Sequence, residues 1–270
     1  MNATLLAATV ERILRQLTRD HRTVALVLVV PVVLLTLVRY MFDGRPQVFD
    51  TMGLVMLGIF PFIVMFLITS IAMLRERTSG TLERMLTTPV AKLDLLLGYG
   101  IAFGLAAAVQ AGVACSVAYG VLGLDTSGGW WWVLLIAVVN AVLGVALGLL
   151  CSAFAQSEFQ AVQFMPLVAF PQIFLCGLLV PRDQMVGWLE ALSDVMPLTY
   201  AVRALREVGT SAGASAQMWA DIGIVAVVAR TPALRRMVWR VAVNEVTHAL
   251  PAWLKREVQQ AWNESGQRGI

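Results

Sequence analysis

RERTSGTLERMLTTP, residues 75–89, is a polar island between two long stretches that carry no charged side chain, residues 51–74 and residues 95–124. Both stretches exceed the roughly 20 residues that cross a hydrocarbon core as a helix. We therefore expect two membrane-spanning helices that present residues 75–92 as a loop on one face of a bilayer.

The composition agrees with a membrane protein, because 59% of the residues are hydrophobic, 14% are charged, and the mean hydropathy is +0.76. Such a chain has too few polar side chains to cover a soluble core. Leu, Val and Ala recur without the alternation of a transmembrane barrel strand, so the fold class is all-α, a polytopic membrane helical bundle. Five clear spans are expected over the charge-free runs 23–38, 51–74, 95–124, 126–157 and 159–181.

A sixth span is expected after Trp219, but it is doubtful. Asp221 and Arg230 leave only a short uncharged run between them, and Arg235, Arg236 and Arg240 follow. Residues 230–270 form either the inner continuation of a strained crossing or a basic tail lying on a surface, and both alternatives remain open. The transmembrane domain is thus assigned to residues 23–229.

Residues 1–22 precede the first span and show an amphipathic helical pattern. Leu6, Val10, Ile13, Leu14 and Leu17 recur at helical spacing, while charged residues occupy the other face. The pattern predicts an interfacial helix on the inner leaflet. The alternative is a solvated helix that only leads into the first span.

The basic residues sort by loop. With the N-terminus inside, eight Lys and Arg residues lie on the inner face and five lie on the outer face, before the C-terminus is counted. This bias predicts a cytoplasmic N-terminus. It also explains the net charge of +3 without nucleic acid, because the basic residues stand beside spans as topology determinants.

The sequence offers no defensible site for bond-breaking chemistry. The only lysines, Lys92 and Lys255, lack the context of a phosphate-binding P-loop, so ATP hydrolysis is not expected in this chain. His21 and His248 are far apart, and the three cysteines fall inside apolar runs, so neither a metal site nor a disulfide is predicted. Spans two to five contain no charged residue that could couple transport to protons. Energy for transport must then arrive through a surface such as the polar island.

Within the island, Leu82, Met85 and Leu86 fall on one side of a possible short helix, and Pro89 ends it. A helix with apolar anchors and charges can sit in a groove of a partner. A solvated loop is the alternative. On the other face of the bilayer, residues 182–218 suggest one or two short amphipathic helices separated by Pro197, lying at or dipping into the outer interface.

Two ordered motifs carry a resemblance to a known family. Glu76-Arg77-x-x-Gly80-Thr81-Leu82-Glu83-Arg84-Met85-Leu86-Thr87-Thr88-Pro89 resembles the cytoplasmic loop of type-2 ABC transporter permeases of the drug-exporter (daunorubicin-resistance) kind. The second motif runs from Gly177 to Met185 and on through residues 196–205, and it is similar to that family's signature after the fifth span. The resemblance covers roughly residues 1–229 and ends where Arg230-Thr231-Pro232 replaces an expected apolar helix.

The resemblance implies a six-span half-permease of the bacterial plasma (inner) membrane, which exports drugs, lipids or similar hydrophobic or amphiphilic molecules. The permease is not itself an enzyme and holds no cofactor. It pairs with a second copy or a sister permease, and two separate ATPase subunits bind ATP and Mg. A non-transporting membrane scaffold or sensor, and an intramembrane enzyme, are the alternatives.

The resemblance also assigns roles to residues. Residues 1–22 become the connecting helix, and the residues that couple to the ATPase are Glu76, Arg77, Gly80, Thr81, Leu82, Glu83 and Arg84. The outer gate is the segment 182–218, and its predicted residues are Pro197 and Tyr200 within it and Pro181 directly before it. Aromatic residues near the span prolines are candidates for an apolar substrate pathway, although core packing would explain them equally well; they are Phe60, Phe62, Phe66, Phe164, Phe170 and Phe174.

Overall fold

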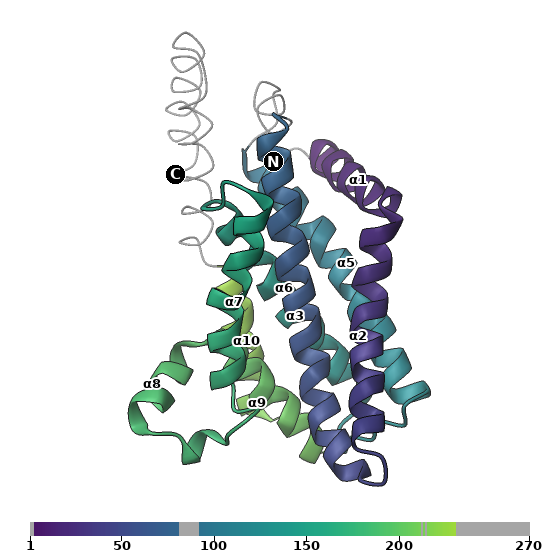
Figure 1. The fold of residues 1–270 in the computed structure, drawn as a ribbon, viewed down its shortest axis with the longest axis vertical. Helices are drawn as coiled ribbons and strands as arrows, with labels where there is room; N and C mark the ends of the chain where they lie inside the picture. Colours follow the sequence, from purple (N-terminus) through teal and green to yellow (C-terminus); the bar gives the residue numbers. More distant parts are fainter. Residues whose placement is uncertain (1–2, 81–91, 212, 214, 231–270) are drawn as a thin grey trace.

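The computed structural model of the chain describes residues 3–80, 92–211, 213 and 215–230, and every regular element in these ranges is helical. This confirms the all-α prediction. Figure 1 shows the bundle, with its elements in chain order. The elements are α1 (Ala3–Arg19), α2 (His21–Met41), α3 (Pro46–Thr78), α5 (Lys92–Gly120), α6 (Trp130–Ser152), α7 (Glu158–Leu175), the 3-10 helix η1 (Arg182–Gln184), α8 (Gly187–Val195), α9 (Pro197–Thr210) and α10 (Ala216–Arg230).

Within the described ranges, α2, α3, α5 and α6 are long and apolar enough to cross a membrane, and α10 is a shorter apolar helix. The fifth predicted span, residues 159–181, corresponds to α7, which is shorter than expected and ends at Leu175. It ends there because Gly177 adopts a φ of +87°, a left-handed conformation that terminates helices and suits glycine. The polytopic membrane bundle is confirmed, but α7 is not among the helices that are long and apolar enough to cross a membrane, so the fifth predicted span is not confirmed as a span.

The boundary between α3 and the predicted loop 75–92 also differs from the expectation. Helix α3 continues through Thr78, so residues 75–78 form its last turn and not the start of a loop. The backbone N–H of Ser79 still bonds to the carbonyl of Arg75, and Gly80 then leaves the helix with a φ of +71°. Charge pattern alone places the end of the helix too early, because exposed charged residues are good helix formers.

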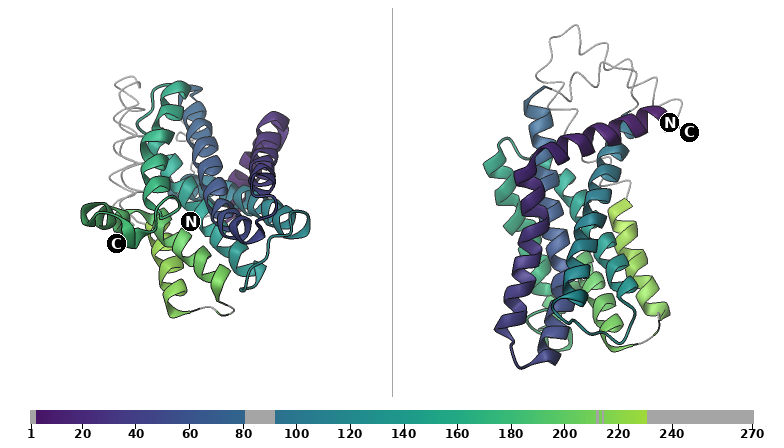
Figure 2. Two further views of the ribbon diagram at one scale, coloured as in Figure 1. Left: turned by 60° about the horizontal axis from the view of Figure 1, so that its bottom comes forward. Right: turned by 90° about the vertical axis from the view of Figure 1, so that its right-hand side faces the viewer.

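Helix α1 crosses one end of the bundle at a steep angle to α2, as the right-hand view of Figure 2 shows. Asp20 caps α2 at the bend by accepting a hydrogen bond from the backbone N–H of Thr23. The apolar side of α1 packs through Ile13 into a cluster with Tyr99 and Met73. This angle is the one predicted for an interfacial helix, but protein covers much of the apolar side. We call this end of the molecule the α1 end.

The central contact of the bundle lies between α3 and α6. A side chain added at Gly144 or Gly148 would clash with the backbone of Phe62 or Phe66, so these two glycines allow the helices to approach closely. At Gly100 and Gly112 no described atom lies within 4 Å of such an added Cβ, so close approach is not their role.

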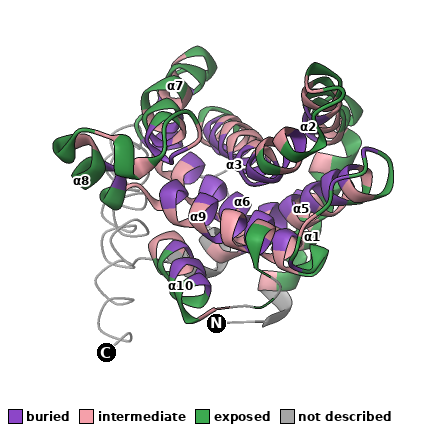
Figure 3. Cartoon of the chain, turned by 90° about the horizontal axis from the view of Figure 1, so that it is seen from below, coloured by how far each residue is buried: buried purple, intermediate pink, exposed green. Residues whose placement is uncertain are grey.

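At the opposite end, Pro197 begins α9 and separates it from α8, as predicted. Figure 3 shows a mainly buried α9 and an exposed α8. The apolar side of α9 enters the core, where Leu205 occupies the space beside Gly58. The segment therefore dips into the bundle through α9, while α8 lies outside it.

Helix α10 packs against α6 and α9, and its Asp221 is completely buried. The carboxylate of Asp221 accepts two hydrogen bonds from the guanidinium of Arg203, of which the one from Nε measures 2.6 Å. This pairing removes one objection to a sixth span. The charge of Asp221 is compensated by Arg203 of α9, so it does not interrupt the apolar helix as an unpaired charge would. Residues 231–270, which include the rest of the predicted tail, lie outside the described residues.

Candidate functional site

The residues from Arg75 to Gly80 form the strongest candidate site that the structure describes, and we call them the α3 terminal turn. They lie at the α1 end, form the start of the polar island and directly precede residues 81–91. Their side chains reach four other helices. The contacts follow from helical geometry, since three consecutive residues project about 100° apart around the helix axis.

Arg75 points toward α7 and forms a two-pronged ion pair with Glu158, the first residue of that helix. Nε of Arg75 lies 2.7 Å from Oε1 of Glu158, and Nη2 lies 3.0 Å from Oε2. Both side chains are more than half exposed, so we expect the pair to stabilise the fold by no more than about 1 kcal/mol. Its planar, forked geometry instead holds the end of α3 in register with the start of α7.

Arg77 points in another direction and donates a hydrogen bond from Nη1 to the carbonyl oxygen of Ser152, the last residue of α6. The last carbonyls of a helix lack partners within the helix and carry partial negative charge. A guanidinium is a suitable donor there. The α3 terminal turn is thereby joined to the ends of both α6 and α7.

Glu76 faces the interior and is only 5% exposed. Its Oε1 lies 3.6 Å from Nη1 of Arg12 in α1, and Nη2 of Arg12 donates to the hydroxyl of Tyr99 in α5 at 2.9 Å. Oε2 of Glu76 has no hydrogen-bond partner among the described residues. A buried carboxylate is costly without compensation, so Arg12 is what makes this position tolerable.

A count of charges does not predict the burial of Glu76, because it ends the membrane span at residue 74. The sequence feature that does indicate burial is local. Leu74 and Met73 continue the apolar helix, so the next residues stay helical and one of them must face inward. Arg12 and Tyr99 come from distant parts of the chain, and no pattern in the sequence pairs them with Glu76.

Of the predicted coupling residues, the structure describes Glu76, Arg77 and Gly80, and it brings them together in the α3 terminal turn. Thr81, Leu82, Glu83 and Arg84 lie outside the described residues, as does the proposed short helix around them. That part of the site stays a prediction.

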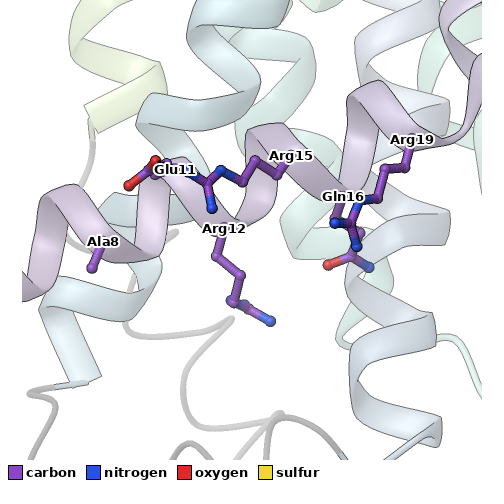
Figure 4. A pocket seen from close by; sticks show the side chains of 6 residues that line it. All are labelled: Ala8, Glu11, Arg12, Arg15, Gln16 and Arg19. Carbon is purple, nitrogen blue, oxygen red and sulfur yellow. Dashed lines mark hydrogen bonds and ion pairs between the residues drawn. The ribbon is translucent and has the colours of Figure 1, made fainter.

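The polar side of α1 adds a basic surface at the same end. Glu11, Arg12, Arg15, Gln16 and Arg19 line a pocket of about 480 Å³, shown in Figure 4. Arg15 is held by Glu11 one turn earlier at 2.5 Å. Arg12 thus belongs to two environments, since its stem lines this pocket and its guanidinium reaches Glu76 and Tyr99.

At the opposite end, one of the predicted gate residues, Tyr200, lies in a polar network. The hydroxyl of Tyr200 donates to the carbonyl oxygen of Asp194 at 2.7 Å, and the guanidinium of Arg203 lies 5.1 Å from the centre of the Tyr200 ring. Arg182, which follows Pro181, forms an ion pair with Asp194. Pro197 starts α9 between these contacts. Pro181 lies between α7 and η1, whereas Pro197 and Tyr200 lie in the first turn of α9.

The six predicted pathway phenylalanines are not brought together. Phe62 and Phe66 are fully buried in the core of the bundle, where α3 meets α6. Phe60 and Phe164 are partly buried, whereas Phe170 and Phe174 stack edge to face on an exposed side of α7 with ring centres 6.3 Å apart. Among the residues that the structure describes, no group of three His, Cys, Asp or Glu residues could hold a metal ion.

Comparison with known proteins identifies the family of this chain. The model of the family described as ABC-2 type transporter matches residues 4–208. The "Probable multidrug ABC transporter permease YbhR" of Escherichia coli (strain K12) is 25% identical over 134 residues, which is 50% of this chain and 36% of that protein. "Nodulation protein J" of Rhizobium meliloti (strain 1021) is 28% identical over 137 residues, or 50% and 51% of the two chains.

A eukaryotic relative, "ABC transporter G family member 20" of Dictyostelium discoideum, is 28% identical over 141 residues, or 52% of this chain and 19% of that protein. The chain thus matches between about a fifth and a half of the length of these relatives. The finer resemblance, to the daunorubicin-resistance kind, stays a prediction. Since the family model spans most of the sequence, the chain belongs to the ABC-2 type transporter family.

Proposed function

We propose that the chain is the transmembrane permease subunit of an ATP-driven exporter of hydrophobic or amphiphilic molecules. Separate ATPase subunits bind ATP and Mg and hydrolyse the nucleotide. The observation that carries the proposal is the α3 terminal turn, which ties the segment leading into residues 81–91 to α1, α5, α6 and α7. Family membership and the transporter names of the relatives support it.

In the proposed mechanism, the ATPase receives residues 81–91 and moves them when it binds and hydrolyses ATP. A loop joined to the bundle by a single flexible segment would not transmit this motion to the helices. Here the adjoining turn is held by an ion pair at α7, a hydrogen bond at α6 and the buried Glu76 beside Arg12. The displacement is thereby passed to several helices as a rigid-body movement, which is how packed elements transmit motion.

The proposed orientation places the α1 end in the cytoplasm of a bacterial plasma membrane. The excess of Lys and Arg on that side supports it. The basic pocket of α1 and the Arg75–Glu158 pair then face the ATPase and the lipid headgroups. Helix α8 and the Tyr200 network face the outside as the gate.

The proposed second permease, either another copy or a sister subunit, would cover the side of the bundle where α2 and α7 flank α3, as Figure 3 shows. Both helices carry exposed apolar side chains, among them Leu37 of α2, which is 58% exposed, and Phe174 of α7, which is 56% exposed. Of the six candidate pathway residues, Phe60, Phe164, Phe170 and Phe174 are accessible enough to contact a substrate. We assign Phe62 and Phe66 a packing role.

The proposal is tested by the ATPase activity of the complex reconstituted in lipid vesicles. Gly80→Pro should abolish stimulation by a hydrophobic amine dye, because proline cannot adopt the φ of +71° found at this position. Glu83→Arg should have the same effect by reversing a charge on the docking surface. Gly112→Ala is the control, since its position has open space. Full stimulation in both variants would argue for a scaffold or sensor.

A further inference from the structure

A groove of about 450 Å³ opens on the side of the bundle below α1, between α2 and α3, with α5 at its back. Its volume lies within the range of about 300–1,000 Å³ that is usual for ligand sites. The walls are apolar, and the side chains that define them include Leu26, Val30, Ile63, Leu67, Ile71 and Phe103. Leu26 is 61% exposed, so the groove is accessible from the membrane side. We call it the α2–α3 groove.

The polar residues of the groove gather at one end. Asp20, Arg75 and Glu76 line it beside α1, while the far end at Val30 and Ile63 is entirely aliphatic. From Asp20 to Val30 the wall runs over ten residues of α2, or about 15 Å of helix rise. This is half of the roughly 30 Å hydrocarbon thickness of a bilayer. The groove has the length and polarity of one lipid in one leaflet.

The polar end contains an unusual acceptor. Glu76 is more than nine-tenths buried, it lines the groove, and its Oε2 has no hydrogen-bond partner among the described residues. Oε2 itself is covered by protein, so a donor in the groove could bond to it only after a small rotation of the Glu76 side chain. A buried acceptor without a donor is costly, which would favour that rotation. Asp20 adds a second carboxylate whose oxygens each accept one hydrogen bond from Thr23, so both keep acceptor capacity.

The polar end also holds a cation. Arg75 uses Nε and Nη2 for Glu158, which leaves Nη1 as the guanidinium nitrogen for a further acceptor. A ligand that fits therefore has a hydrogen-bonding cation for Glu76 and Asp20, an anionic group for Arg75, and an acyl chain. A phospholipid with a primary amine has all three. A choline headgroup has the same charges, but its nitrogen carries no N–H to donate.

We propose that the α2–α3 groove is a binding site for an aminophospholipid of the adjoining leaflet, with one acyl chain between α2 and α3 and its ammonium group at Glu76 and Asp20. Lipid binding at this site needs neither nucleotide nor the ATPase. The bound lipid would complete the hydrogen bonding of Glu76 and fix α2 to α3 beside the α3 terminal turn.

The test is photolabelling of the full chain in nanodiscs, using phosphatidylethanolamine or phosphatidylcholine with the same diazirine-bearing acyl chain. Mass spectrometry locates the label. The proposal expects label on residues 20–30 and 63–76, with phosphatidylethanolamine favoured about tenfold, the order of one charge-assisted hydrogen bond. Equal labelling by the two lipids in the unmodified protein, or label spread evenly over α2 and α7, would overturn it.

Three variants test the position and the lipid preference of the site. Ala72→Phe places a ring in the groove and should reduce labelling there about tenfold, whereas Val33→Phe, on an exposed part of α2 that does not line the groove, should leave it unchanged. Asp20→Asn with Glu76→Gln should bring phosphatidylethanolamine down to the level of phosphatidylcholine. Undiminished labelling of Ala72→Phe would contradict the site. The lipid preference of the unmodified protein decides the matter even if a variant fails to fold.

Discussion

At the scale of single residues, the informative positions are two buried carboxylates, Glu76 and Asp221. Each lies where a charge count predicts the end or interruption of a span, and each is compensated from a distant helix, by Arg12 and by Arg203. Sequence reasoning could list these charges but could not pair them, because the partners are brought together only by packing. Charged residues near span ends are therefore poor markers of where a buried helix stops.

The Asp221 pair gives a stability prediction. Arg203→Ala should lower the free energy of unfolding by about 3–5 kcal/mol, because it leaves a fully buried carboxylate without its cation. Arg203→Met combined with Asp221→Leu should recover most of that loss, since no charge is then buried. Thermal unfolding of the detergent-solubilised protein measures both. An unfolding temperature that is unchanged in Arg203→Ala would show that the pair does not hold α10 to α9.

At the scale of helices, charge-free runs predicted the bodies of α2, α3, α5 and α6 well, because the length of an apolar helix is set by the bilayer. The ends were predicted less well. Helix α3 runs past the last apolar residue, and α7 stops early at Gly177. The burial of α9 was only partly foreseen, since its Arg203 and Arg206 suggested a surface segment. These arginines are instead satisfied by Asp221 and by the carbonyl of Gly177.

The α3–α6 contact gives a matched pair of glycine substitutions. Gly148→Ala should destabilise the fold by about 1–3 kcal/mol, because its Cβ would meet the backbone of Phe66. Gly112→Ala should be neutral or stabilising by about 0.5–1 kcal/mol, because alanine favours helix and the position is open. Unfolding midpoints of the two variants, compared side by side, test the contact. Equal shifts would mean that Gly148 does not set the helix separation.

At the scale of the whole molecule, a membrane bundle carries the α3 terminal turn at one end and the Tyr200 network, which we propose as the gate, at the other. The family is established by the match over residues 4–208, whereas transport, substrate class and partners are proposals. Four of the seven predicted coupling residues, Thr81, Leu82, Glu83 and Arg84, lie outside the described residues. The described residues show a feature absent from the sequence prediction, namely that the polar island begins within the last turn of α3, which is tied to other helices.

The orientation of the whole molecule is tested by labelling from each side of the membrane. Thr18→Cys, exposed on α1, should react with an impermeant maleimide only in inverted membrane vesicles, whereas Asp183→Cys, exposed in η1, should react in intact spheroplasts. The native cysteines give little background, since Cys115, Cys151 and Cys176 are buried. The opposite pattern would reverse the proposed topology and remove the α1 end as the surface for a cytoplasmic ATPase.

The central claim is that this subunit supplies no energy itself and receives work through the α3 terminal turn. The most direct measurement is ATP-dependent movement of a fluorescent amphiphile in proteoliposomes that contain the permease with or without its ATPase. The account predicts transport only when the ATPase and ATP are both present, and its loss in Gly80→Pro. Transport by the permease alone, or undiminished transport in Gly80→Pro, would contradict it.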